Sequence, residues 1–366
     1  MNNILLLHIG TNKTGTTAIQ DFLAMNRESL GSFWEYPDLF AEFTNSAITN
    51  MKNGCLLNNS VKFNWNESDK NRLWRIIKSH LSSKNVIVSE ESMWGDDFAR
   101  RYVTTRDRLK DFKGYYDRLL VLVYLRRQDL YIESLWNQCV KSGSTSDDIY
   151  SFYKSQEDGL LHYSRVLSEI EDVIGKENII VRAFEGKQFE GESADVISDF
   201  VYVLNSISDL SMDLSSMVIP NRVNESLPDD VLCSVLTYLK EYYNITKHPI
   251  PQEIVQMFIK MQEEKSDGKK SFYLSREKRK EILIQYSDEN AMIARRYLNR
   301  NDGKLFFDDN IDYPLLTDYE VSKEETERIV EFAKLTAELS VRIQTEKTTL
   351  LRHPIRLLSS IIKREI

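Results

Sequence analysis

The sequence has 366 residues, of which 42% are hydrophobic and 11% aromatic, so the chain can bury a substantial core. Its formal net charge of −8 argues against a general nucleic-acid binder, whose affinity would come from clustered lysine and arginine. Three separated cysteines form no CxxC pair and fit a reduced compartment, and no apolar run reaches the roughly 18 residues of a membrane span. We expect a globular, cytoplasmic protein without a transmembrane segment.

Four short apolar runs predict the strands of a buried parallel sheet. They occupy residues 4–9, 86–88, 119–125 and 179–181. Helical patterns separate these runs, so the expected fold class is α/β, a P-loop-type parallel β-sheet flanked by helices. Ligands of such sheets bind beyond the carboxyl ends of the strands, so the residues just after each run are the first candidates for chemistry.

The helical patterns between and after the strands suggest three parts. Helices are expected at residues 69–83, capped by Ser68, and at 129–141, 147–174, 231–243, 250–262 and 276–286. Residues 40–67, rich in Asn and Ser, predict a long surface excursion or a disordered stretch, and a contribution to an acceptor pocket is open. Ser322 begins a capping box for a last helix. We expect an α/β core at 1–225, a helical lid or subdomain at 226–318 that continues the catalytic domain, and a helical C-terminal tail at 319–366.

The loop after the first strand carries the strongest signal in the chain. Unpaired amides at a helix start and the helix dipole attract an anion, and Gly10 and Gly15 let the backbone approach it closely. Lys13 adds a mobile positive charge, and Thr16 and Thr17 add hydroxyl donors. A Walker A loop would place lysine at the position of Thr16, so this loop departs from the nucleotide-hydrolase pattern. The predicted binding residues are Gly10, Thr11, Asn12, Lys13, Thr14, Gly15, Thr16 and Thr17.

The stretch KTGTT at residues 13–17 is similar to the 5′-phosphosulfate loop of sulfotransferases that use 3′-phosphoadenosine 5′-phosphosulfate (PAPS). The chain resembles bacterial sulfotransferases of the HIGxxKTGTT type over residues 1 to about 205. The resemblance implies transfer of a sulfuryl group from PAPS to a hydroxyl, with no metal. By analogy with the family, the expected acceptor is a carbohydrate or lipid-linked glycan of cell-surface polysaccharide biosynthesis.

A second motif follows the third apolar run, where Arg126 stands at the strand end and Ser134 follows eight residues later. The resemblance implies that this pair holds the 3′-phosphate of PAPS. An arginine suits a phosphate because its guanidinium is a fixed fork of donors. The family usually has Asn and Pro after the arginine, whereas this chain has Arg127 and Gln128, so the anchor is Arg126 or Arg127. A basic strand end before an ordinary helix is the alternative.

A third motif supplies candidates for a general base. Glu90 and Glu91 follow the second apolar run, beside the predicted phosphosulfate loop, and a carboxylate there can take the proton of an acceptor hydroxyl. Glu91 is the first choice because the resemblance implies a glutamate at that place, and Glu90 is the alternative. A solvated acidic turn is the competing interpretation. His8 also lies near the loop, but a histidine at the end of a buried strand more often bonds the neighbouring backbone.

The rest of the chain adds weaker expectations. Arg222 either closes over the nucleotide or lies in a surface turn. The tail at 350–366 has an apolar face flanked by Lys and Arg, which predicts docking on its own domain, a homo-oligomer contact or peripheral contact with the inner membrane face. No compact ligand set such as HExxH predicts a metal. The rival functions are a P-loop kinase of a sugar or nucleotide and a non-catalytic nucleotide-binding protein of the same fold.

Overall fold

The structure is a computed structural model that describes residues 3–30, 33–45, 52–94, 104–112, 115–208, 212–221, 226–316 and 321–345. The chain divides into two compact units. The first comprises Met1–Tyr131, Gln156–Asn224 and Lys280–Asn310, and the second comprises Ile132–Ser155, Glu225–Arg279 and Ile311–Ile366. The first of the chain positions that separate them falls within helix α6 (Gln128–Lys141). The division into core, lid and tail at residues 225 and 318 stays a prediction.

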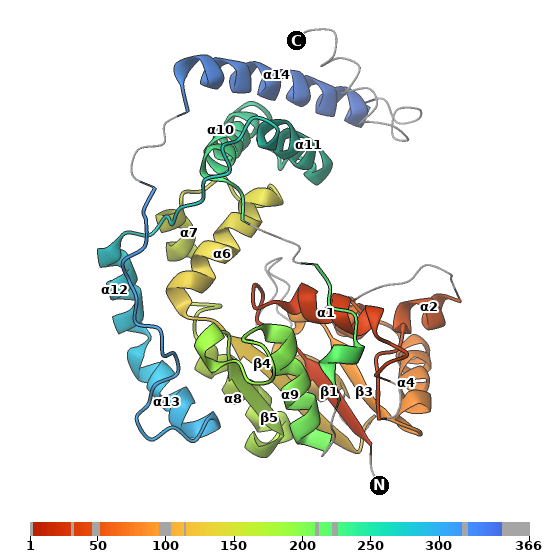
Figure 1. The fold of residues 1–366 in the computed structure, drawn as a ribbon. Helices are drawn as coiled ribbons and strands as arrows, with labels where there is room; N and C mark the ends of the chain where they lie inside the picture. The colour runs from red at the N-terminus through yellow and green to blue at the C-terminus, as the bar shows by residue number, and fades with distance from the viewer. Residues whose placement is uncertain are drawn as a thin grey trace. The chain divides into compact units, whose positions relative to one another are not determined.

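The first unit is built on a five-stranded sheet in which every neighbouring pair is parallel (Figure 1). The strand order is β2-β3-β1-β4-β5, and the bounds are β1 (Ile4–His8), β2 (Trp34–Glu35), β3 (Asn85–Ser89), β4 (Arg118–Leu125) and β5 (Ile179–Ala183). The predicted α/β class is confirmed, and each predicted run lies within a strand, except that the first run extends one residue beyond β1. β2 has no counterpart in the prediction because two residues cannot form a recognisable apolar run.

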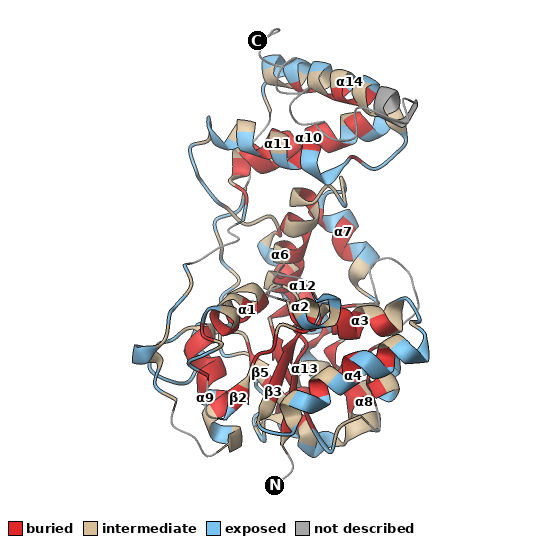
Figure 2. Cartoon of the chain, turned by 90° about the vertical axis from the view of Figure 1, so that its right-hand side faces the viewer, coloured by how far each residue is buried: buried red, intermediate tan, exposed pale blue. Residues whose placement is uncertain are grey.

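Helices cover both faces of this sheet, which explains why most residues of β1, β3 and β4 are buried and apolar (Figure 2). One face is covered by α1 (Thr16–Met25) and α9 (Val196–Ser208). The other is covered by α4 (Glu67–Leu81), which contacts β3, and α8 (Tyr163–Ile174), which contacts β5. The core beneath α1 and α9 includes Leu6, Ile19, Phe22, Leu122 and Phe200. The remaining helices of the unit are α2 (Leu39–Thr44), α3 (Cys55–Lys62), α5 (Thr105–Phe112) and α13 (Ser287–Tyr297).

Two predicted helices differ from the observed ones. Asn66 rather than Ser68 caps α4, because the Asn66 Oδ1 atom accepts the N–H of Asp69 at 3.0 Å. The helix expected at 147–174 is divided into α7 (Ile149–Gln156) and α8. The chain turns between them, where the Gly159 N–H donates to the Gln156 carbonyl at 3.0 Å. The helical spacing of apolar residues continues across this turn, so the sequence pattern did not indicate that the helix is interrupted.

The segment at 40–67 is more ordered than an irregular excursion. Most of α2 and all of α3 lie within it, and α3 buries Leu56 and Leu57. The rings of Phe43 and Trp65 pack with centroids 5.4 Å apart. Residues 46–51 lie outside the described part of the chain. The described part of the segment therefore contributes Leu56 and Leu57 to the core of the first unit.

The regular elements of the second unit are helices in the part that is described. Its helix α10 (Asp229–Thr246) packs against α11 (Gln252–Glu263) and α14 (Lys323–Thr345). The ring of Tyr238 lies at their centre, 4.4 Å from Phe258 and 5.3 Å from Phe332 between ring centroids. The Glu325 N–H donates to Ser322 Oγ at 3.2 Å, so the predicted cap of the last helix is confirmed. Helix α12 (Arg276–Gln285) contains the boundary at residue 279.

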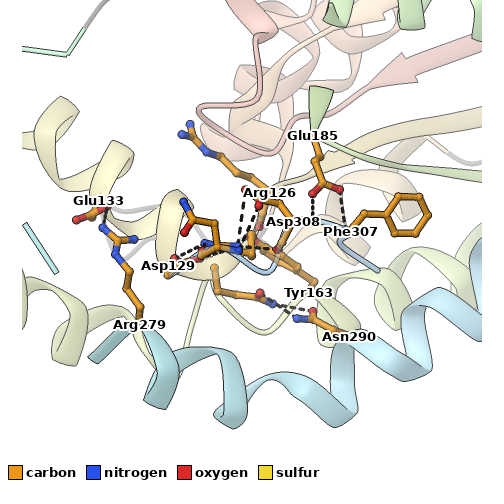
Figure 3. A network of polar contacts seen from close by, with 12 residues as sticks. Arg126, Asp129, Glu133, Tyr163, Glu185, Arg279, Asn290, Phe307 and Asp308 are labelled. Atoms are coloured by element: carbon orange, nitrogen blue, oxygen red, sulfur yellow. Dashed lines mark hydrogen bonds and ion pairs between the residues drawn. The ribbon is translucent and has the colours of Figure 1, made fainter. Parts of the chain in front are cut away.

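A buried ion pair stabilises the second unit. The carboxylate of Glu133 accepts from Arg279 Nη2 at 2.6 Å and from the N–H groups of Tyr273 and Leu274 at 2.6 and 2.7 Å (Figure 3). These bonds satisfy both oxygens of a carboxylate that is otherwise removed from water. Among the helices described, none combines the length and apolar character that a membrane span requires.

Candidate active site

The loop between β1 and α1 is fixed to the end of β4 by backbone hydrogen bonds. The Thr11 N–H donates to the Tyr124 carbonyl at 2.9 Å, and the Tyr124 N–H donates to the Gly10 carbonyl at 2.7 Å. Gly10, Lys13 and Gly15 have φ angles of 107°, 64° and 75°, a region that glycine enters readily and lysine rarely. The loop thus curves tightly at the start of α1, where the helix dipole favours an anion.

The four threonines of the loop divide into two pairs. Thr11 and Thr14 are fully buried, and their hydroxyls donate to the carbonyls of Tyr124 at 3.2 Å and of Thr11 at 2.6 Å. They hold the shape of the loop. Thr16 and Thr17 begin α1, and the Thr16 hydroxyl donates to the carboxylate of Glu91.

Glu91 lies against this loop. It begins the 3-10 turn η1 (Glu91–Met93) just after β3, and a Cβ added to Gly10 would lie 3.5 Å from Glu91 Cα and Cβ. Lys52 Nζ donates to Glu91 Oε1 at 2.8 Å, while Thr16 donates to Oε2. Burial alone would raise the pKa of Glu91, but the Lys52 ammonium and the hydrogen bonds from Lys52 and Thr16 hold it below its usual value. The carboxylate is therefore ionised at neutral pH.

Glu90 occupies a different environment. It is 4% exposed, and its Oε1 atom accepts the N–H and the hydroxyl of Ser92 at 3.0 and 2.7 Å. Its own N–H donates to the His8 carbonyl at 2.9 Å. These bonds fix the turn after β3, so Glu91 is the better candidate for a base.

His8 is fully buried at the end of β1. Its Nδ1 atom lies 2.9 Å from Ser89 Oγ, and its ring stands edge-on to Tyr124 and Phe200. Burial lowers the pKa of His8 to about 4 against the opposing pull of Glu91, so the imidazole is neutral at pH 7. A neutral ring without solvent exposure suits packing better than contact with an acceptor.

The two adjacent arginines after β4 have different surroundings. Arg126 is half-buried, and its Nη1 atom donates to the Lys13 carbonyl at 3.1 Å. Its guanidinium also lies 5.7 Å from the centre of the Phe184 ring. The structure thus brings Arg126 to the loop that carries Lys13.

Arg127 is 4% exposed and has a structural role. Its Nε and Nη2 atoms donate to the Asp129 carboxylate at 2.7 and 2.9 Å, and its Nη1 and Nη2 atoms donate to the carbonyls of Asp308 and Asn310 at 2.6 and 2.7 Å. Glu185 binds the same segment, since it accepts the N–H groups of Phe307 and Asp308 (Figure 3). Arg127 therefore ties two distant parts of the first unit together.

The remaining predicted site residues make no described contact that links them to Lys13 or Glu91. Asn12 is half-buried in the loop itself, and Ser134 is half-buried on α6, among the residues of the second unit. Arg222 and the tail at 350–366 lie outside the described residues. No group of three or more His, Cys, Asp and Glu side chains that could hold a metal ion occurs in the part of the chain that the structure describes.

Lys52 contacts Glu91 in the site, and the sequence did not predict this contact. It lies in an Asn- and Ser-rich segment and belongs to no recognisable motif. Only its partner Glu91 was a candidate. The pairing depends on how the segment before α3 folds back on β3, which local sequence patterns do not encode.

Comparison with known proteins gives little evidence about the family or the activity of the chain. No family model and no curated protein matches the chain. Among solved structures, the crystal structure of a sulfotransferase from Alicyclobacillus acidocaldarius is similar over 63% of this chain and 89% of that chain, with 17% identity and a TM-score of 0.37. A similarity this weak establishes neither a shared fold nor a shared activity. The fold class is therefore assigned from the topology of the sheet, and the function is proposed from the geometry of the site.

Proposed function

We propose that the protein is a sulfotransferase that moves a sulfuryl group from PAPS to a hydroxyl of a carbohydrate or glycolipid. One observation carries the proposal. One residue from each of three motifs along the sequence lies at the carboxyl edge of one sheet, where Arg126 contacts the Lys13 carbonyl and Glu91 contacts the loop at Gly10 and Thr16. A ligand with two phosphate-type groups needs such separated donors around one loop.

The proposed reaction uses the loop and Glu91 in different roles. The acceptor oxygen forms a bond to sulfur as the bond from sulfur to the 5′-phosphate oxygen breaks, and adenosine 3′,5′-bisphosphate leaves. Glu91 takes the acceptor proton. Lys13, Thr16 and Thr17 and the amides at the start of α1 stabilise charge on the sulfuryl and leaving-group oxygens. Thr11 and Thr14 keep the loop in shape.

Contacts far from the sulfur atom would align PAPS for the reaction. We assign the 3′-phosphate to Arg126, with Ser134 as a second donor on the sequence resemblance, because a fixed contact there holds the reacting atoms in line. Arg127 is not assigned to the ligand, since its donors bind Asp129 and two carbonyls. The reaction as proposed needs no metal.

A thermal-shift experiment separates this function from its rivals. Adenosine 3′,5′-bisphosphate at about 100 times its Kd is expected to stabilise the protein by about 2.7 kcal/mol, whereas ATP with Mg²⁺ at equal concentration gives a much smaller shift. Adenosine is the control for a contribution of the base alone. Selective stabilisation by ATP with Mg²⁺ would instead favour a kinase, and no stabilisation by either would rule out both nucleotide-binding functions.

A further inference from the structure

Lys52 reaches the site on a chain segment that is fixed to the edge of β3. The Asn53 side chain replaces a strand neighbour there, because its Nδ2 donates to the Ile87 carbonyl at 2.8 Å and its Oδ1 accepts the Ser89 N–H at 2.9 Å. The Gly54 N–H donates to the Ser89 carbonyl at 3.3 Å. Asn53 is fully buried, so these bonds form away from water and hold the segment in one position.

Gly54 permits this close approach. A Cβ at residue 54 would lie 2.6 Å from Glu90 Cβ and 3.0 Å from the Ser89 carbonyl oxygen, which leaves no space for any other residue. The backbone beside Lys52 therefore packs directly on the turn that begins with Glu90 and Glu91. The segment thus fixes the backbone of a lysine whose ammonium group binds Glu91 at the carboxyl edge of the sheet.

The titratable groups near Glu91 differ from those near Lys52. Glu91 faces Lys52 and the buried His8, and both its oxygens are engaged, one by Lys52 and the other by Thr16. Lys52 faces Glu91, Glu90, Cys55 and Asp21. Without Lys52, an unbalanced carboxylate would stand beside a loop suited to anions, and like charges in a partly buried site repel strongly.

We propose that Lys52 is a positioning residue that balances the charge of Glu91 and holds its carboxylate at the loop after an incoming anion takes the Thr16 hydroxyl. The inference rests on the proposed function for its catalytic meaning. It also gives the segment before α3 a role in the site. When the Thr16 hydroxyl turns to the ligand, the contact with Lys52 keeps the Glu91 carboxylate ionised and in place.

The first test needs no ligand. The Glu91 carboxyl is followed by NMR in protein labelled at the glutamate side-chain carboxyl carbon, with Glu91→Gln identifying the signal. Lys52→Met is expected to move the Glu91 titration to higher pH, because the opposite charge is removed. Lys52→Arg is expected to keep the titration near that of the wild type. Lys62→Met, which removes a lysine lying over the Phe63 ring on α3, is the matched control and should change nothing.

The second test is a double-mutant cycle on binding of adenosine 3′,5′-bisphosphate at pH 7.5. Lys52→Met alone is expected to weaken binding on the order of tenfold, but to have little effect in the Glu91→Gln background, where no charge needs balancing. An equal loss in both backgrounds would mean that Lys52 acts on the ligand or the fold directly and would overturn the proposal. So would an unchanged Glu91 titration in Lys52→Met.

The outcomes also separate this inference from the proposed function. Sulfation by the wild type should fall as pH drops through the Glu91 titration, and in Lys52→Met this fall should begin at higher pH. If the NMR titration shifts but no acceptor is sulfated, the pairing of Lys52 with Glu91 stands and the sulfotransferase assignment fails. If sulfation is found but the titration does not shift, the assignment stands and the role of Lys52 is wrong.

Discussion

Replacing Glu91 by glutamine is expected to lower kcat for sulfuryl transfer by about 100- to 10,000-fold, because an amide cannot accept the proton of the acceptor hydroxyl. Affinity for adenosine 3′,5′-bisphosphate should stay the same or improve, since a negative charge beside the loop is removed. Single-turnover rates with PAPS, together with calorimetric titration of the bisphosphate, measure the two effects separately.

Glu90→Gln is the matched control for this experiment. The two carboxylates are adjacent in sequence, but Glu90 is used by the N–H and hydroxyl of Ser92. We expect Glu90→Gln to keep kcat within about threefold and to lower the free energy of unfolding by about 1 kcal/mol, the usual effect of weakening a buried hydrogen bond. A large loss of kcat in Glu90→Gln with normal turnover in Glu91→Gln would reverse the assignment of the base.

Replacing Arg127 by methionine is expected to lower the free energy of unfolding by about 3–5 kcal/mol, because it removes the ion pair between Arg127 and the fully buried carboxylate of Asp129. The carbonyls of Asp308 and Asn310 lose their donor as well. Urea denaturation monitored by circular dichroism measures the change. Adding Asp129→Asn to this variant should recover part of the loss, since the buried negative charge that Arg127 balanced is then removed as well.

Arg126→Met is the matched control for stability. Arg126 is half-buried, and its Nη1 atom donates to the backbone carbonyl of Lys13. Its replacement is expected to change the free energy of unfolding by about 1 kcal/mol or less. If Arg126→Met destabilised the protein as much as Arg127→Met, Arg126 would be a structural residue and its assignment to the ligand would be wrong.

The sequence predicted the fold where local apolar patterns decide it. Buried parallel strands are apolar on both faces, so residues 4–9 and 119–125 were recognisable as continuous runs. Patterns were less informative where tertiary contacts decide the structure. The turn at Gly159 interrupts a continuing helical periodicity, and Asn66, two residues before the expected cap, accepts the N–H of Asp69 in the first turn of α4.

The site was predictable in its motifs but not in its pairings. The spacing of Gly10, Lys13 and Gly15 indicated an anion loop, and the loop has the backbone that such a role requires. The choice between Arg126 and Arg127 could not be made from sequence, because it depends on carbonyls some 180 residues further along the chain. Lys52 was missed for the same reason, since the bonds of Asn53 to β3 bring it to Glu91.

The central claim is that the Lys13 loop and Arg126 hold opposite ends of one doubly phosphorylated adenosine. Calorimetric titration of wild-type and Arg126→Met protein with adenosine 3′,5′-bisphosphate and with adenosine 5′-monophosphate tests it directly. The account predicts that Arg126→Met weakens binding of the bisphosphate by about 10- to 100-fold, the usual effect of losing charged hydrogen bonds to a phosphate, and leaves binding of the monophosphate unchanged. Equal weakening of both ligands, or of neither, would contradict it.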